Sequence, residues 1–258
     1  MQQKTKLLAT ACAVAFGLLA GCSHHTPGTL SNQAAAQDAL HQALSPSGIA
    51  QTAKAVRQSQ LPQPVATTPQ TAYATLNSGN QLMFLYYALS GLPPDYDSIA
   101  QKYSVDYRNT SDEFRKHDLM AALKPQIDAS IKAAANQRYV IWTVGNTRIG
   151  HYDFNKKAFP LDDGILQQGG SGYFFDNSSY QIEFVNGAAF ASMPVADENV
   201  AKDIEARVSR YQGFNIQIDA FAQSADPSDH HVKCVITRVS LLAPDGTTLA
   251  TTTTGAPA

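Results

Sequence analysis

Large aromatic side chains are confined to one part of this chain, and this limits where a packed core can form. Of the 22 phenylalanine and tyrosine residues, only Phe16 lies before Tyr73, and the single tryptophan is Trp142. A segment with so few large apolar groups cannot offset the entropy lost when its backbone is ordered. We therefore expect one folded domain over residues 72–258, long enough to enclose a substantial core.

The first 21 residues have the pattern of an export signal. Lys4 and Lys6 precede residues 7–19, an apolar run interrupted only by Thr10. This run is shorter than the ~20 apolar residues that cross a bilayer as a helix, and small residues follow it. The pattern predicts a signal peptide over residues 1–21 and not a transmembrane helix.

The residues Leu19-Ala20-Gly21-Cys22 resemble the lipobox of bacterial lipoproteins. The resemblance implies cleavage between Gly21 and Cys22, followed by acylation of the Cys22 thiol and of the new amino terminus. Two or more acyl chains hold a protein stably on a bilayer, whereas one chain binds only marginally. Ser23, which stands where an aspartate would favour the inner membrane, implies the outer membrane. The alternative is an ordinary signal peptide with an incidental cysteine.

Residues 22–71 form the expected tether between the lipid and the domain. Ala, Gln, Ser, Thr and Pro dominate this segment, and its later prolines favour extended backbone. Two weakly helical patches, residues 33–44 and 49–58, are separated by Ser45-Pro46-Ser47-Gly48. A flexible tether is the main interpretation, and the alternative is a helix that docks on the domain through Leu40, Leu44 and Val56.

Charge and cysteine content exclude several classes of function. Removal of residues 1–21 leaves 17 basic against 21 acidic side chains, a formal net charge of −4. This balance gives no electrostatic reason to bind nucleic acid or an anionic lipid surface, so the acylated Cys22 is the expected contact with the bilayer. Cys12 leaves with the signal, so Cys234 has no disulfide partner. Its apolar neighbours predict a buried side chain.

Helical periodicity is concentrated in the first half of the domain. It predicts helices over residues 80–90 and about 95–103, and a longer one after a capping box formed by Thr110 and Glu113. Pro125 is expected to kink this longer helix or to split it in two. One stripe of the helix should face the core, and it consists of Leu119, Leu123, Ile127 and Ile131.

Strand patterns dominate the second half. Residues 139–144 are continuously apolar or β-favouring, which predicts a strand buried on both faces, and Gly145-Asn146 suggests a turn after which residues 147–154 pair back. Further strands are expected at residues 180–184, 214–220, 232–242 and 249–254, with a helix at 197–210 between them. The prediction is therefore an α+β fold, in which N-terminal helices precede a mainly antiparallel sheet with one intervening helix.

Motifs for catalysis or cofactor binding give little signal. The chain has no Gly-x-Ser-x-Gly, no phosphate-binding Gly-Lys-Ser/Thr loop and no His-Glu-x-x-His, so no cofactor is expected. The glycine-rich residues 167–172 are expected to form a hairpin loop that could carry contacts. His151, close to Asp153, could serve a hydrolase only with a suitably placed serine.

One loop combines imidazole and carboxylate groups in a way that suggests a metal site. Asp226, His230 and His231 are the candidate metal ligands. Adjacent histidines in extended backbone point to opposite sides, however, so a polar turn is the competing interpretation.

Aromatic residues offer the other candidate contacts. Tyr173 and Phe174 precede a predicted strand, and aromatic groups are enriched at interfaces and in ligand clefts.

The sequence thus favours a lipoprotein anchored in the outer membrane, with a periplasmic domain that acts as a non-catalytic binding or assembly module for an envelope protein or cell-wall ligand. The alternative is a periplasmic hydrolase with a histidine-containing site.

The domain itself looks like the uncharacterised-domain lipoproteins found in many Proteobacteria. This resemblance is carried by three segments: Asn80–Leu92, Pro93-Pro94-Asp95-Tyr96 and the terminal Pro244-Asp245-Gly246 turn. Such families bring no assigned activity to carry over.

Overall fold

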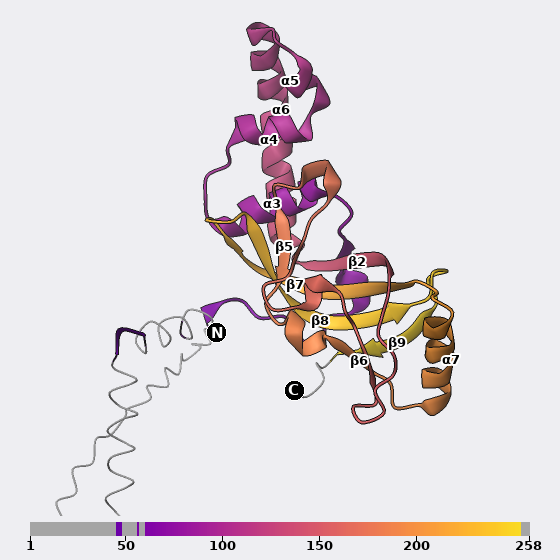
Figure 1. Cartoon of the computed structure of the whole chain (residues 1–258). Coiled ribbons are helices and arrows are strands. Elements are labelled where there is room, and N and C mark those ends of the chain that lie inside the picture. Colours follow the sequence, from indigo (N-terminus) through magenta and orange to yellow (C-terminus); the bar gives the residue numbers. More distant parts are fainter. Residues whose placement is uncertain (1–44, 48–55, 57–59, 254–258) are drawn as a thin grey trace, which may run out of the picture. The chain divides into compact units, whose positions relative to one another are not determined.

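A computed structural model describes residues 45–47, 56 and 60–253 of the chain (Figure 1). The chain divides into two units after Gln60, of which the second, residues 61–258, is compact. The expected signal peptide, cleavage site and lipidated Cys22 lie outside the described residues. Among the residues that are described, no helix is long and apolar enough to cross a membrane.

The second unit is α+β, as predicted, and its helices come first. They are α3 (Gly79–Ser90), α4 (Tyr96–Tyr103), α5 (Val105–Asn109) and α6 (Glu113–Asn136). Ser78 caps α3 and shares a capping box with Gln81, and α3 ends where Gly91 adopts the left-handed conformation that glycine tolerates. The helices predicted at 80–90 and 95–103 are thus confirmed. The helices α4, α5 and α6 pack together at one end of the unit (Figure 1).

The start and the continuity of α6 differ from the prediction. Its N-cap is Asp112, whose carboxylate accepts from the backbone N–H groups of Phe114 and Arg115, so the expected capping box of Thr110 and Glu113 is wrong. The helix also continues through Pro125 without a break. Leu123 and Ile127 are buried on either side of the proline, and this packing keeps the two halves in one helix.

The main sheet has the strand order β1-β2-β7-β8-β5-β4, and β9 also pairs with β8. The pairs β1–β2 and β5–β8 are parallel and the other pairs are antiparallel. A separate two-stranded sheet joins β3 and β6, and α7 packs against β9 at the end of the unit away from α4 (Figure 1). These elements have the following bounds: β1 Ala74–Thr75, β2 Tyr139–Thr147, β3 Ala158–Pro160, β4 Ser171–Gly172, β5 Gln181–Phe184, β6 Ser192–Pro194, α7 Glu198–Ser209, β7 Phe214–Asp226, β8 His231–Leu242 and β9 Thr248–Thr252.

The strand β2 is buried on one face only, which corrects the expectation of two buried faces. Val140 and Trp142 lie in the core, whereas Tyr139 and Ile141 on the other face are partly exposed and Thr143 is exposed. The expected turn at Gly145-Asn146 is also wrong, because β2 continues to Thr147 and pairs with β7. The register shifts at this point, and the side chain of Asn215 accepts from the backbone N–H of Asn146 at 3.0 Å. This non-local contact takes the place of a hairpin.

The long antiparallel pair β7–β8 forms the centre of the core. The strands expected at 214–220 and 232–242 are confirmed, and β7 extends further, to Asp226. Cys234 is fully buried, as predicted, and within the described part of the chain it forms no disulfide. Burial raises the pKa of its thiol.

Residues 61–71, which composition places in the tether, belong to this unit. The backbone N–H of Val65 donates to the Tyr139 hydroxyl at 2.8 Å, and the amide of Gln223 donates to the Pro62 carbonyl at 3.1 Å. Both partners lie on the sheet. The folded unit therefore includes residues 61–71.

Candidate functional site

The aromatic segment before β5 divides between the core and the surface. The Phe174 ring packs against Trp142, with ring centroids 4.4 Å apart. Tyr173 is 48% exposed and Phe175 is 94% exposed, and their rings are 5.6 Å apart. Of the two expected contacts, Tyr173 therefore lies at the surface and Phe174 packs against the core. Phe175, the third aromatic residue of this run, was not among the expected contacts, although alternation along extended backbone places it on the same side as Tyr173.

A polar hollow of about 490 Å³ lies beside Phe175. The Lys102 ammonium at its wall donates to the Ser179 hydroxyl at 2.9 Å. Within the described part of the chain, no hydrogen-bond acceptor or carboxylate partner is found for the Arg108 guanidinium. The lining comes from α4, α5 and the segment after β4, and consists of Ser98, Gln101, Lys102, Arg108, Phe175, Asp176, Asn177, Ser178 and Ser179.

Asp176 attaches this aromatic segment to the start of α3. Its carboxylate accepts from the Ser78 hydroxyl at 2.6 Å and from the backbone N–H of Gly79 at 2.9 Å. Partial burial alone raises the pKa of Asp176, but these hydrogen bonds outweigh it and hold the pKa below its usual value. The charge of Asp176 is thus directed to the positive end of α3.

The backbone approach at this junction requires a glycine. A Cβ atom on Gly79 would lie 2.4 Å from the carbonyl oxygen of Asn177, which is too close for any other residue. Asn177 is buried, and its amide donates to the side chain of Asn80 at 3.1 Å. The position of Phe175 therefore depends on Asp176 and Asn177, which follow it directly, and on their contacts with the first turn of α3.

The hollow combines three kinds of recognition group. Lys102 and Arg108 supply positive charge. The negative charge of Asp176, which also lines the hollow, is held by the hydrogen bonds that it accepts from Ser78 and Gly79 at the start of α3. Serine hydroxyls and the Gln101 amide can both donate and accept hydrogen bonds. Phe175 presents a nearly free aromatic face. Such a set suits a hydroxyl-rich ligand that carries a carboxylate.

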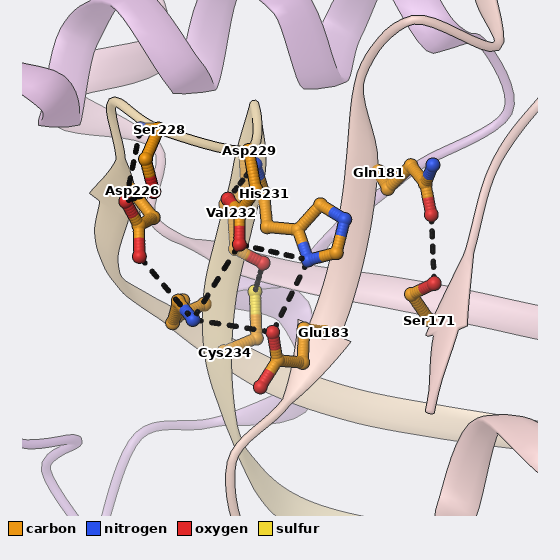
Figure 2. A network of polar contacts seen from close by, with 10 residues as sticks. Ser171, Gln181, Glu183, Asp226, Ser228, Asp229, His231, Val232 and Cys234 are labelled. Carbon is orange, nitrogen blue, oxygen red and sulfur yellow. Dashed lines mark hydrogen bonds and ion pairs between the residues drawn. The ribbon is translucent and has the colours of Figure 1, made fainter. Parts of the chain in front are cut away.

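A second polar cluster lies where β5 and β8 run parallel (Figure 2). The Lys233 ammonium lies 3.2 Å from Glu183, 3.6 Å from Asp226 and 4.0 Å from Asp229. His231 turns toward two of these carboxylates, with its Nδ1 3.2 Å from Glu183 and 3.5 Å from Asp229 (Figure 2). We call these five residues the β5–β8 cluster.

Two carboxylates of the β5–β8 cluster are stabilised in their charged form. Burial alone raises the pKa of Glu183, but hydrogen bonds from His231 and Lys233 lower it below its usual value. The pKa of Asp226 is lowered chiefly by hydrogen bonds from the hydroxyl and backbone of Ser228. The cluster therefore keeps its negative charge at neutral pH.

The three metal ligands expected from the sequence do not converge. His231 is in the β5–β8 cluster, and the ion pair of Asp226 within that cluster is with Lys233 and not with the imidazole. His230 points elsewhere, with its ring 5.1 Å from that of Tyr86 and 5.3 Å from that of Tyr180. Among the described residues, the group whose ligand atoms lie within 4.8 Å of one another consists of Glu183, Asp229 and His231. Glu183 could not be found from the sequence, because it is 48 positions from His231 in the chain. The two residues meet only through the parallel pairing of β5 with β8.

His151 pairs with Glu205 of α7 and not with Asp153. Its Nδ1 lies 2.6 Å from the Glu205 carboxylate, whereas Asp153 accepts from backbone N–H groups in its own turn. The Ser209 hydroxyl also donates to Glu205, at 3.3 Å. Ser209 therefore does not form the serine–histidine hydrogen bond that activates a nucleophile.

A groove of about 560 Å³ runs beside this pair, between α7 and the loop that carries Tyr152 and Phe154. Lys157 and Lys202 lie among its lining residues with Glu198 and Glu205, so its charges are mixed.

No protein-family model, curated protein or solved structure matches this chain.

Proposed function

We propose that this chain is a lipid-anchored protein of the outer membrane whose periplasmic domain binds acidic glycan of the cell wall without catalysing a reaction. The observation that carries the proposal is the hollow in which Lys102 and Arg108 lie beside the exposed ring of Phe175. The anchor is inferred separately, from the lipobox at Cys22.

The lining of the hollow favours a saccharide over other ligands. A sugar ring offers hydroxyl and acetamide groups to polar side chains, and its C–H face can stack on an aromatic ring such as Phe175. Carboxylates on the glycan or its attached peptides would pair with Arg108, whose planar guanidinium can make two parallel hydrogen bonds. An apolar peptide would require a mainly apolar lining, which this hollow lacks.

The length of the chain before the domain suits this role. Residues 23–60 separate the expected lipid from the folded unit. A coil of this length has a root-mean-square span of roughly 35 Å, at ~5–6 Å times the square root of the number of residues. A domain held on such a tether can meet the cell wall while its lipid stays in the outer membrane.

A periplasmic hydrolase remains the second candidate, and the pair His151–Glu205 favours it. A carboxylate at 2.6 Å from Nδ1 can orient an imidazole as a general base. The serine beside it binds the carboxylate, so the mechanism would need an activated water. Loss of a measurable ester or amide hydrolysis in His151→Ala would support this candidate over the binding module.

The proposal is tested on the mature lipoprotein extracted in detergent. Mass spectrometry of its N-terminus should show an acylated Cys22 as the first residue, and an unmodified Cys22 would overturn the anchor. The protein should co-sediment with purified cell-wall sacculi, and raised salt should weaken this binding because two cations take part. Absence of co-sedimentation at low salt would overturn the glycan ligand and leave the anchor intact.

A further inference from the structure

We propose that Glu183, Asp229 and His231 of the β5–β8 cluster form a binding site for one Zn²⁺ ion. The site shares no residue with the hollow beside Phe175, and it is independent of the glycan proposal. The ligand atoms are the Oε2 of Glu183, the Oδ2 of Asp229 and the Nδ1 of His231.

Two of the three separations between these atoms are close to those around zinc, and the third, between the two carboxylates, is within 4.8 Å. Zinc binds nitrogen and carboxylate oxygen at about 2.0–2.2 Å in tetrahedral geometry, which places neighbouring ligand atoms about 3.3–3.5 Å apart. The His231 Nδ1 lies 3.2 Å from Glu183 and 3.5 Å from Asp229. The imidazole therefore stands at the correct distance from both carboxylates, and water would complete the tetrahedron.

Strand register, a backbone hydrogen bond and burial restrict the positions of the three ligand side chains. In the parallel pair, Glu183 lies opposite Lys233, two residues along β8 from His231, so both side chains lie on the same face of the sheet. The other oxygen of Asp229 accepts from the backbone N–H of His231 at 2.9 Å, which leaves Oδ2 directed at the imidazole. The side chains of Glu183 and His231 are each 19% exposed, so they have little freedom to turn away.

The net negative charge of the cluster favours the binding of a divalent cation. Its three carboxylates face one ammonium, and with a neutral imidazole the cluster has an excess of two negative charges. Lys233 already holds the place of a cation near Glu183 and Asp229, and it also reaches Asp226 at 3.6 Å. Zinc binding would move the ammonium to Asp226, where it would keep a partner.

The donor set selects zinc among the common divalent ions. Ca²⁺ and Mg²⁺ prefer shells of oxygen and take six or more ligands, whereas zinc accepts imidazole nitrogen together with carboxylate oxygen in a four-coordinate site. A histidine ligand coordinates a metal in its neutral form, so the binding measurements are made at pH 7.5. We therefore expect Ca²⁺ and Mg²⁺ to bind far more weakly than Zn²⁺.

Calorimetric titration of the detergent-extracted mature protein with ZnCl₂ tests the site. The titrations use a background in which His24→Ala and His25→Ala remove the adjacent histidines of the N-terminal segment. We expect one Zn²⁺ per chain in this background, with similar binding in the control His117→Ala, whose imidazole is exposed beside Asp118.

Two kinds of variant give opposite results if the site is real. Removal of a single outer hydrogen-bond partner already weakens metal sites about 10–100-fold, so loss of a direct ligand in His231→Ala or Glu183→Gln should weaken binding by at least about 100-fold. Lys233→Gln removes the competing cation and should tighten binding, an increase that misfolding cannot produce. Unchanged affinity in His231→Ala, or weaker binding in Lys233→Gln, would overturn the proposal.

Discussion

The carboxylate of Asp176 accepts a hydrogen bond from the backbone N–H of Gly79, the first residue of α3, at 2.9 Å. The two residues are 97 positions apart in the chain. This bond, with that from the Ser78 hydroxyl, joins the segment that carries Phe175 to the most buried helix of the unit. The shape of the hollow therefore depends on a cap that no local sequence pattern predicts.

Asp176→Asn should destabilise the folded unit at neutral pH and leave its stability unchanged in acid. The pKa of Asp176 is lowered in the folded state, so its stabilisation is fully present above the unfolded-state pKa of about 3.9 and is lost as pH falls through the lower folded value. Because the carboxylate is exposed, the loss at pH 7 should be about 1 kcal/mol or less.

Urea denaturation of Asp176→Asn at pH 7 and near pH 2 measures this difference. Asp162→Asn is the matched control, since this carboxylate is exposed and no hydrogen bond or ion pair is found for it in the described part of the chain. A difference from wild type that persists at pH 2 would show that the charge of Asp176 is not its cause.

Gly79→Ala should displace the segment that carries Phe175. The added methyl group would lie 2.4 Å from the Asn177 carbonyl oxygen, and such overpacking costs about 1–3 kcal/mol. Gly164→Ala is the control, because a Cβ there meets no atom within 4 Å. We expect a lower melting temperature for Gly79→Ala alone. Equal melting temperatures of the two variants would contradict the close approach.

Much of the fold follows from local patterns, and these were predicted correctly. The helix α3 has apolar residues at helical spacing and ends at a glycine, and both signals lie in its own stretch of sequence, although its cap at Ser78 was not predicted. The β8–β9 hairpin likewise has a turn sequence between the two strands that it joins. Such signals depend on neighbours along the chain, so a single sequence reveals them.

The errors arose where partners are distant in the chain. Gly145-Asn146 has the local composition of a tight turn, but the side chain of Asn215 binds the backbone there and β2 continues. The number of buried faces of β2 depends on which elements cover the sheet, and composition does not show this. The β5–β8 cluster was found only in part, because Glu183 reaches His231 through parallel pairing.

Arg238→Met should be among the most destabilising single changes in the sheet. Asp219 is 1% exposed, and Arg238 donates to its carboxylate from Nε at 2.6 Å. Removing the arginine leaves a buried carboxylate without its cation, which costs about 3–5 kcal/mol. The double variant Asp219→Leu/Arg238→Met removes both charges and should recover most of the loss. Chemical denaturation of both variants measures this, and a double variant no more stable than Arg238→Met would contradict it.

The thiol of Cys234 should be unreactive in the folded protein. It is fully buried, and burial raises its pKa, so little thiolate is available to attack a disulfide reagent. In the mature protein with an acylated Cys22, Ellman's reagent should detect no thiol before denaturation and one afterwards. Rapid reaction of the native protein would contradict the burial, and two thiols after denaturation would contradict the acylation.

The most direct test of glycan binding compares two exposed phenylalanines. Phe175 lies at the hollow and is 94% exposed, whereas Phe114 on α6 is 87% exposed and lies outside it. The dissociation constant for purified sacculi should rise at least about tenfold in Phe175→Ala, equivalent to ~1.4 kcal/mol, and should not change in Phe114→Ala. Equal affinity of wild type and Phe175→Ala for the sacculi would contradict binding through the hollow.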